Sequence, residues 1–249
     1  MKFLLLLLFA CSVQANTIDE KCPMNVLWGA PVSQEGSNQY LCRTNYAVDY
    51  SYKTKTPVYV VEHITPEHII ITVQRKNNFR KDTEIDQQHR STLKDYANAI
   101  YDRGHLAAAA NFTYDESVMS ESFLLSNMMP QDQKNNRVIW NHLEQNIRKL
   151  VGKSKGLYVI TGTIYSKEYK SIGNGVGVPD EIYKIVIDSS RERMIAFRFP
   201  NKAIDSNLVS NYIVSVKSIE DSIGVDFSPD IPKNLKHLES EVVKYKDWF

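Results

Sequence analysis

The stretch from Asp102 to Glu144 restricts the fold more than any other part of the chain. It opens with the tetrad Asp102-Arg103-Gly104-His105 and continues with polar and aromatic residues at intervals of four or five: Asn127, Gln131, Asn136, Trp140 and Glu144. Apolar residues recur there with the period of a helix, at Trp140, Leu143, Ile147 and Leu150. We therefore predict a helix that is capped by Asn135 or Asn136 and that stops at Gly152.

Runs of β-branched and aromatic residues predict strands around this helix. Residues 58–62 and 69–73 form one expected pair, residues 157–164 a single strand, and residues 182–187 and 194–199 a hairpin. A further strand is expected over residues 121–129, ended by Pro130, and the apolar run at 69–73 indicates burial on both faces. Helices do not alternate regularly with these strands, so the predicted class is α+β with a mixed, mainly antiparallel sheet.

Residues 1–15 have the composition of an export signal. A short positive start precedes an apolar run over residues 3–10, and Ala15 is the small residue that a signal peptidase requires. This run is far shorter than the ~18–20 residues of a membrane span. We expect a secreted or periplasmic protein; lipid attachment at Cys11 is the alternative, and the bulky Phe9 disfavours it.

Cys22 and Cys42 form an even pair of cysteines beyond the expected signal. We predict a disulfide between them that closes a loop of about 20 residues, worth ~3 kcal/mol in the chain-entropy model. Two free thiols are the alternative. The expected organisation is an N-terminal arm over residues 16–56, stapled by this disulfide, followed by the main domain over residues 57–249.

The net charge argues mildly against a uniformly basic surface. The chain has 30 Lys and Arg against 29 Asp and Glu, and removal of residues 1–15 takes away Lys2, which leaves 29 of each sign. Non-specific nucleic-acid binders usually carry a basic surface. A local basic groove is still compatible with a neutral total.

The side chains of the central stretch suit metal-assisted hydrolysis of a phosphodiester. His105 is a base near neutral pH, and Arg103 offers a planar fork that matches phosphate oxygens. Asn136, near the first turn of the helix, presents an amide oxygen of the kind that Mg²⁺ prefers. Glu144 lies eight residues further along, ~12 Å at 1.5 Å per residue, so it can act only through a metal-bound water.

Each of these residues also has an ordinary structural interpretation. A lone histidine is more often a satisfied structural residue, and Asp102 and Arg103 could form a local ion pair. Asn136 could be a helix cap, and Glu144 a solvent-exposed charge. It is the combination with the tetrad that favours the chemical interpretation.

These motifs resemble the DNA/RNA non-specific endonucleases, the family of secreted bacterial nucleases and mitochondrial endonuclease G. The resemblance covers about residues 57–245 and is strongest over 79–144. It includes Phe79-Arg80-Lys81-Asp82, Asp102 to His105 and Ala107 to Asn111, and the spacing from Asn127 to Glu144 matches at every marked position. One departure is Ala108, where many members have proline.

The resemblance implies a ββα-metal finger with His105 as general base and Asn136 as ligand of one Mg²⁺, for which Mn²⁺ could substitute. Arg103 would contact the phosphate, and Glu144 would steady the waters of the metal. Substrate-binding roles are expected for four further residues, Arg80, Asp102, Asn127 and Gln131. The implied activity is hydrolysis of DNA and RNA to 5′-phosphate products.

Two other functions remain open from the sequence. One is a nucleic-acid-binding module on the same fold with weak or lost catalysis. The other is a sequence-specific endonuclease, but the chain has no zinc-finger or helix-turn-helix pattern for reading bases. Asn111-Phe112-Thr113 is a glycosylation sequon close to His105, and a homodimer is a possible assembly.

Overall fold

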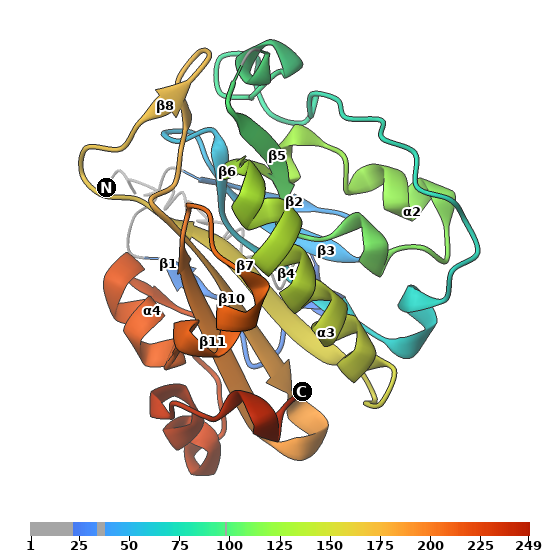
Figure 1. Cartoon of the computed structure of the whole chain (residues 1–249), viewed down its shortest axis with the longest axis vertical. Coiled ribbons are helices and arrows are strands. Elements are labelled where there is room, and N and C mark those ends of the chain that lie inside the picture. Colours follow the sequence, from blue (N-terminus) through green and yellow to red (C-terminus); the bar gives the residue numbers. More distant parts are fainter. Residues whose placement is uncertain (1–21, 34–37, 98) are drawn as a thin grey trace, which may run out of the picture.

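The computed structural model describes residues 22–33, 38–97 and 99–249 (Figure 1). The expected signal over residues 1–15, with Cys11, therefore lies outside the described residues. The main element is a seven-stranded sheet in the order β12-β11-β10-β7-β4-β3-β2, and every neighbouring pair in it is antiparallel. This confirms the α+β class and the mainly antiparallel sheet. The strands are β2 (Asn38–Cys42), β3 (Tyr46–Ser51), β4 (Thr56–Ile64), β7 (Leu157–Ile164), β10 (Glu181–Asp188), β11 (Arg193–Pro200) and β12 (Ile213–Val214).

Both faces of the sheet are covered, which explains why apolar residues predominate on both sides of its strands. On β10, Ile182 and Val186 belong to the core on one face, whereas Tyr183, Ile185 and Ile187 belong to the core on the other. The first face lies beneath α3 (Asn141–Val151), which crosses the sheet in Figure 1. The second lies against α4 (Val216–Ile223) and the 3-10 helix η9 (Lys233–Ser240).

A π-helical segment, η6 (Asn135–Trp140), continues directly into α3, so that the two form one helix. The carboxylate of Asp132 accepts a hydrogen bond from the backbone N–H of Asn135 at 2.8 Å, so Asp132 performs the capping that was expected of an asparagine. Leu143, Ile147 and Leu150 are buried against the sheet, as their spacing predicted.

A two-stranded antiparallel ribbon carries the tetrad. It pairs β5 (Tyr101–His105) with β6 (Met128–Asp132), so that Arg103 lies opposite Pro130 and Gly104 opposite Met129. Pro130 therefore lies within a strand, which the ribbon tolerates because a strand with only one neighbour does not need every N–H. Of the strand expected over 121–129, only the last two residues are extended, at the start of β6, and the residues before them lie at the end of α2 (Glu116–Glu121), in a turn and in the 3-10 helix η5 (Leu125–Asn127).

Two further expectations differ from the structure. Residues 69–73 are not a buried strand: the chain leaves the sheet through η2 (Pro66–Ile69), and the side chain of Ile71 is 81% exposed. Residues 38–51, expected in an N-terminal arm, instead supply β2 and β3 of the main sheet, with Tyr46 and Val48 fully buried. The Cys22–Cys42 disulfide is present and attaches the segment before β1 (Val32–Ser33) to the end of β2.

Candidate active site

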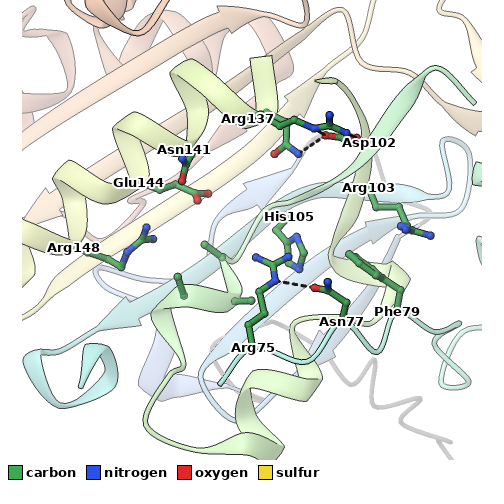
Figure 2. A pocket seen from close by; sticks show the side chains of 14 residues that line it. Arg75, Asn77, Phe79, Asp102, Arg103, His105, Arg137, Asn141, Glu144 and Arg148 are labelled. Carbon is green, nitrogen blue, oxygen red and sulfur yellow. Dashed lines mark hydrogen bonds and ion pairs between the residues drawn. The ribbon is translucent and has the colours of Figure 1, made fainter. Parts of the chain in front are cut away.

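A cavity of about 550 Å³ lies between the β5–β6 ribbon, the helix formed by η6 and α3, and the extended segment 74–79 (Figure 2). Because this helix lines the cavity, it is called the catalytic helix below. It is lined mainly by polar and charged side chains: Arg75, Asn77, Asp102, Arg103, His105, Asn136, Arg137, Asn141, Glu144 and Arg148. Phe79 and three consecutive alanines, Ala108 to Ala110, complete the wall. The structure thus brings together five predicted residues, namely Asp102, Arg103, His105, Asn136 and Glu144.

His105 is the last residue of β5 and is held by aromatic rings. Its imidazole lies 5.0 Å from the ring of Phe123, edge to face, and 5.5 Å from the ring of Phe79. Burial, together with the nearby guanidinium groups of Arg75 and Arg103, lowers the pKa of His105 to about 3. Its Nε2 is buried without a hydrogen-bond partner in the described protein. His105 is therefore a neutral imidazole whose Nε2 has no hydrogen-bond partner among the described residues.

Asp102 fixes the orientation of the Asn136 amide. Nδ2 of Asn136 donates to Oδ2 of Asp102 at 2.9 Å, and Arg137 donates to both carboxylate oxygens of Asp102 at 2.8 and 2.7 Å. No hydrogen bond to Oδ1 of Asn136 is found among the described residues, so the amide oxygen is available in the cavity. Asp102 thus acts as a holder of Asn136 and is itself occupied, which differs from the substrate contact expected of it.

Glu144 lies two turns further along the same helix wall (Figure 2). Its Oε1 is buried and has no hydrogen-bond partner within the described part of the chain. Burial raises the pKa of Glu144, and the positive charges of Lys184 and Arg148 oppose that shift. The expected solvent-exposed alternative for Glu144 therefore does not hold.

Three guanidinium groups surround the histidine and the carboxylate. Arg103 stacks 4.2 Å above the ring of Phe79, and Arg75 lies 5.2 Å from the ring of Phe123. Arg148 donates to Oδ1 of Asn111 at 3.3 Å. These stacked and bonded arginines give the cavity a positive wall suited to phosphate, although the chain as a whole is nearly neutral.

Arg75 and Arg148 line the cavity but were not among the individual site residues predicted from the sequence. Arg148 follows Glu144 by four residues, so the helical period could have placed it on the same face. Arg75 lies in a run of charged residues without a regular period, and only its position in space separates it from its neighbours.

Three predicted substrate-binding residues do not line the cavity. Asn127 is fully buried, and its amide bonds the backbone of Ala107 and Ser122 at 2.9 Å. Gln131 is also fully buried and donates to Oδ1 of Asn135 at 2.9 Å. Arg80 donates to the backbone carbonyl of Ser120 at 2.7 Å. In this structure all three hold the loops and strands that shape the cavity.

The donor set of the cavity fits a small divalent cation. The amide oxygen of Asn136 and the carboxylate of Glu144 are hard oxygen donors, and each has an atom that the described protein leaves without a partner. Within the described part of the chain, no cysteine thiolate is available as a soft ligand, because Cys22 and Cys42 are joined in the disulfide.

Comparison with known proteins identifies the family of this chain. The family model for the DNA/RNA non-specific endonucleases matches residues 29–234. Human mitochondrial endonuclease G is 33% identical over 212 residues, which cover 79% of this chain and 71% of the human protein. The mitochondrial nuclease of Saccharomyces cerevisiae is 32% identical over 78% of this chain and 67% of its own length, and a nuclease of Syncephalastrum racemosum is 34% identical over 86% and 74%.

A solved structure agrees as well. A crystal structure of EndoG in complex with EndoGI, described as revealing the mechanism of EndoG inhibition, superposes with a TM-score of 0.75 at 32% identity. The superposition covers 80% of this chain and 89% of the other. The fold and the site define a hydrolase of the endonuclease class that depends on a divalent metal. The chain belongs to the DNA/RNA non-specific endonuclease family.

These comparisons contradict the expected cellular location. The relatives from human, cattle, budding yeast and fission yeast are named as mitochondrial nucleases, as is the mouse relative EXOG. The expectation of a secreted, periplasmic or lipid-anchored protein was therefore wrong. Within residues 22–33, 38–97 and 99–249, no helix is long and apolar enough to cross a membrane.

Proposed function

We propose that this protein is a Mg²⁺-dependent, sugar-non-specific endonuclease that hydrolyses DNA and RNA to products with 5′-phosphate ends. The observation that carries the proposal is the cavity itself. It holds an unprotonated histidine, an amide oxygen fixed by Asp102 and a buried carboxylate, all within one arginine-lined hollow. None of these groups reads a base, which fits a substrate recognised through its backbone.

His105 is proposed as the general base. A histidine with a lowered pKa is neutral at physiological pH, so its imidazole can accept the proton of an attacking water molecule. The rings of Phe79 and Phe123 restrict its orientation. Arg103, stacked on Phe79, is proposed to contact the phosphate, and Arg75 and Arg148 add positive charge where the transition state gains negative charge.

Asn136 and Glu144 are proposed to hold the cation. Asn136 would supply a direct oxygen ligand, with its amide held the right way round by Asp102, and Glu144 would accept hydrogen bonds from metal-bound water. When bound, Mg²⁺ would neutralise charge on the phosphate and on the departing 3′ oxygen, and Mn²⁺ could replace it. The neighbouring arginines would keep the phosphate next to this site.

The test is digestion of supercoiled plasmid and of RNA by the purified protein, with Mg²⁺ and with a chelator. We expect both substrates to be cut only with the metal, and product ends that a polynucleotide kinase labels only after phosphatase treatment. Binding to nucleic acid without cleavage would instead support the alternative of a catalytically weak binding module. Analytical ultracentrifugation of the same protein would show whether it forms the homodimer considered from the sequence.

The first prediction assigns the base. His105→Ala should lower kcat by ~10²–10⁴-fold, the usual contribution of positioned proton transfer, with little change in nucleic-acid binding. His237→Ala is the matched control, because His237 is exposed and lies on η9 near Glu241. Turnover close to wild type in folded His105→Ala protein would overturn the assignment.

A further inference from the structure

Three polar residues lie on the sheet face directly beneath the catalytic helix. Thr161 of β7 is the register partner of both Val60 on β4 and Lys184 on β10, and Glu62 lies two residues along β4 from Val60. Lys184 and Glu62 are each only 2% exposed and Thr161 is 1% exposed. Their neighbours on this face, such as Val60 and Val186, are apolar core residues.

The side chain of Lys184 extends from the sheet to the catalytic helix. Its Nζ donates to Oγ1 of Thr161 at 2.6 Å and lies 4.7 Å from the centre of the Trp140 ring. Trp140, Glu144 and Arg148 follow one another at intervals of four residues, so they form one stripe along the helix. Lys184 therefore approaches this stripe at its N-terminal end, one turn before Glu144.

Glu62 reaches the other end of the same stripe. Its Oε2 accepts a hydrogen bond from Nδ2 of Asn111 at 3.0 Å, and Oδ1 of Asn111 accepts one from Arg148 at 3.3 Å. Arg148 lies one turn after Glu144. The Lys184 ammonium group thus interacts with the carboxyl groups of both Glu62 and Glu144, and Arg148 is linked to Glu62 through Asn111.

Burial of a lysine is costly, and an apolar side chain of similar volume would often be at least as stable. Lys184 makes one hydrogen bond to a neutral hydroxyl and no ion pair within 4 Å among the described residues. On the helix above Lys184, Oε1 of Glu144 is buried and has no hydrogen-bond partner among the described residues. Fold stability alone therefore gives a poor account of a positive charge at this place.

We propose that Lys184 is a positioning residue for catalysis: its buried ammonium group and its contact with Trp140 hold the Glu144 carboxylate against the cavity. This inference rests on the proposed role of Glu144 toward the cation. Lys184 does not line the cavity and so does not touch nucleic acid. It acts through Glu144, from the opposite side of the helix wall.

The test compares Lys184→Met with the double variant Glu62→Gln/Lys184→Met. Methionine keeps much of the lysine volume without its charge, and the double variant removes one charge of each sign from the sheet face. Val186→Ala is the matched control, because Val186 is fully buried on the same face of β10, two residues from Lys184. For each protein we would measure kcat, KM, the affinity for Mn²⁺ by electron paramagnetic resonance, and the unfolding midpoint.

We expect both lysine variants to lose ~10–100-fold in kcat and in Mn²⁺ affinity, the usual cost of removing a group that orients a residue at a metal site. Their KM should stay within about twofold of the wild-type value. The double variant should be more stable than Lys184→Met but should have the same low kcat. Val186→Ala should have a lower unfolding midpoint, with kcat and Mn²⁺ affinity unchanged. Wild-type kcat and Mn²⁺ affinity in folded Lys184→Met protein, or their recovery in the double variant, would overturn the inference. Failure of the wild-type protein to bind Mn²⁺ or cut nucleic acid would instead refute the proposed function.

Discussion

At the scale of single residues, the site depends on which way an amide points. An asparagine can present either its oxygen or its NH₂ group, and only the oxygen can ligate a cation. Asp102 decides this by accepting from Nδ2 of Asn136, and Arg137 holds Asp102 in turn. Asp102, the first residue of the tetrad, thus orients Asn136, which lies 34 positions further along the chain.

Asn136 and Glu144 should respond differently to truncation. Asn136→Ala removes a direct oxygen from a small ion that demands near-ideal geometry, so we expect severe loss of activity that extra Mg²⁺ rescues poorly. Glu144→Ala removes an outer contact, worth typically 10–100-fold, and should be partly rescued at high Mg²⁺. Activity measured across a Mg²⁺ titration checks both. Substantial activity in Asn136→Ala, with Glu144→Ala inactive throughout, would reverse the two roles.

The sequence could predict the residues that carry the chemistry but not all of those that surround them. His105, Arg103, Asn136 and Glu144 were found because a tetrad and a helical spacing mark them, and the structure places all four at one cavity. Asn127 and Gln131 share that spacing, yet both are fully buried. Spacing along a chain does not distinguish a side chain that faces the cavity from one that holds the wall behind it.

At the scale of elements, the β5–β6 ribbon depends on a glycine packed against a glutamine. A Cβ at Gly104 would lie 2.7 Å from Cβ of Gln131, so no larger residue fits between the two strands. Gln131 in turn bonds Asn135 at the start of the catalytic helix. Gly104 therefore allows a close approach within the protein, between the backbone of β5 and the side chain of Gln131.

Gly104→Ala should therefore separate the ribbon from the helix. We expect a loss of ~1–3 kcal/mol in the free energy of unfolding, the usual cost of overpacking, together with lower kcat because His105 is the next residue. Gly152→Ala is the control, since an added Cβ there meets nothing closer than 3.6 Å. Urea unfolding checks the first effect. Equal stability of the Gly104→Ala and wild-type proteins would contradict this account of the ribbon.

Local sequence pattern predicted the elements that are regular and buried, and failed where tertiary contacts decide. Residues 157–164 form β7 with the expected bounds. The equally apolar run at 69–73 forms no strand, because Thr72 and Val73 donate their backbone N–H groups to Thr113 in a loop instead of to a sheet. An apolar, β-branched run favours a buried strand, but the strand forms only where a neighbouring strand is available to pair with it.

At the scale of the whole molecule, the sheet buries carboxyl groups away from the site as well as near it. Asp49 of β3 is fully buried, and burial raises its pKa to about 7. Burial also raises the pKa of Glu62 to about 7, although Lys184 and Asn111 oppose the effect of burial. Because the folded state holds these protons more tightly than the unfolded chain, their contribution to stability is lost as the pH rises from about 4 through 7.

Asp49→Asn should remove one part of that pH dependence. The stability of the variant relative to wild type should increase between pH 5 and pH 8 by on the order of 2–3 kcal/mol, since asparagine has no proton to lose. Asp86→Asn, at an exposed position, serves as the control. Urea titrations at several pH values give the two slopes. A difference between variant and wild type that stays constant with pH would show that Asp49 does not titrate in this range.

The burial of Asn111 has a consequence for how the protein can be produced. Both ends of its side chain amide are engaged, with Glu62 and Arg148, and the residue is only 5% exposed. A cell that attaches sugar to the sequon Asn111-Phe112-Thr113 does so on the nascent chain, and a bulky glycan there could not enter the core. Expression through a glycosylating secretory pathway should therefore yield misfolded material, and Thr113→Ala, which abolishes the sequon at a partly exposed position, should restore the yield.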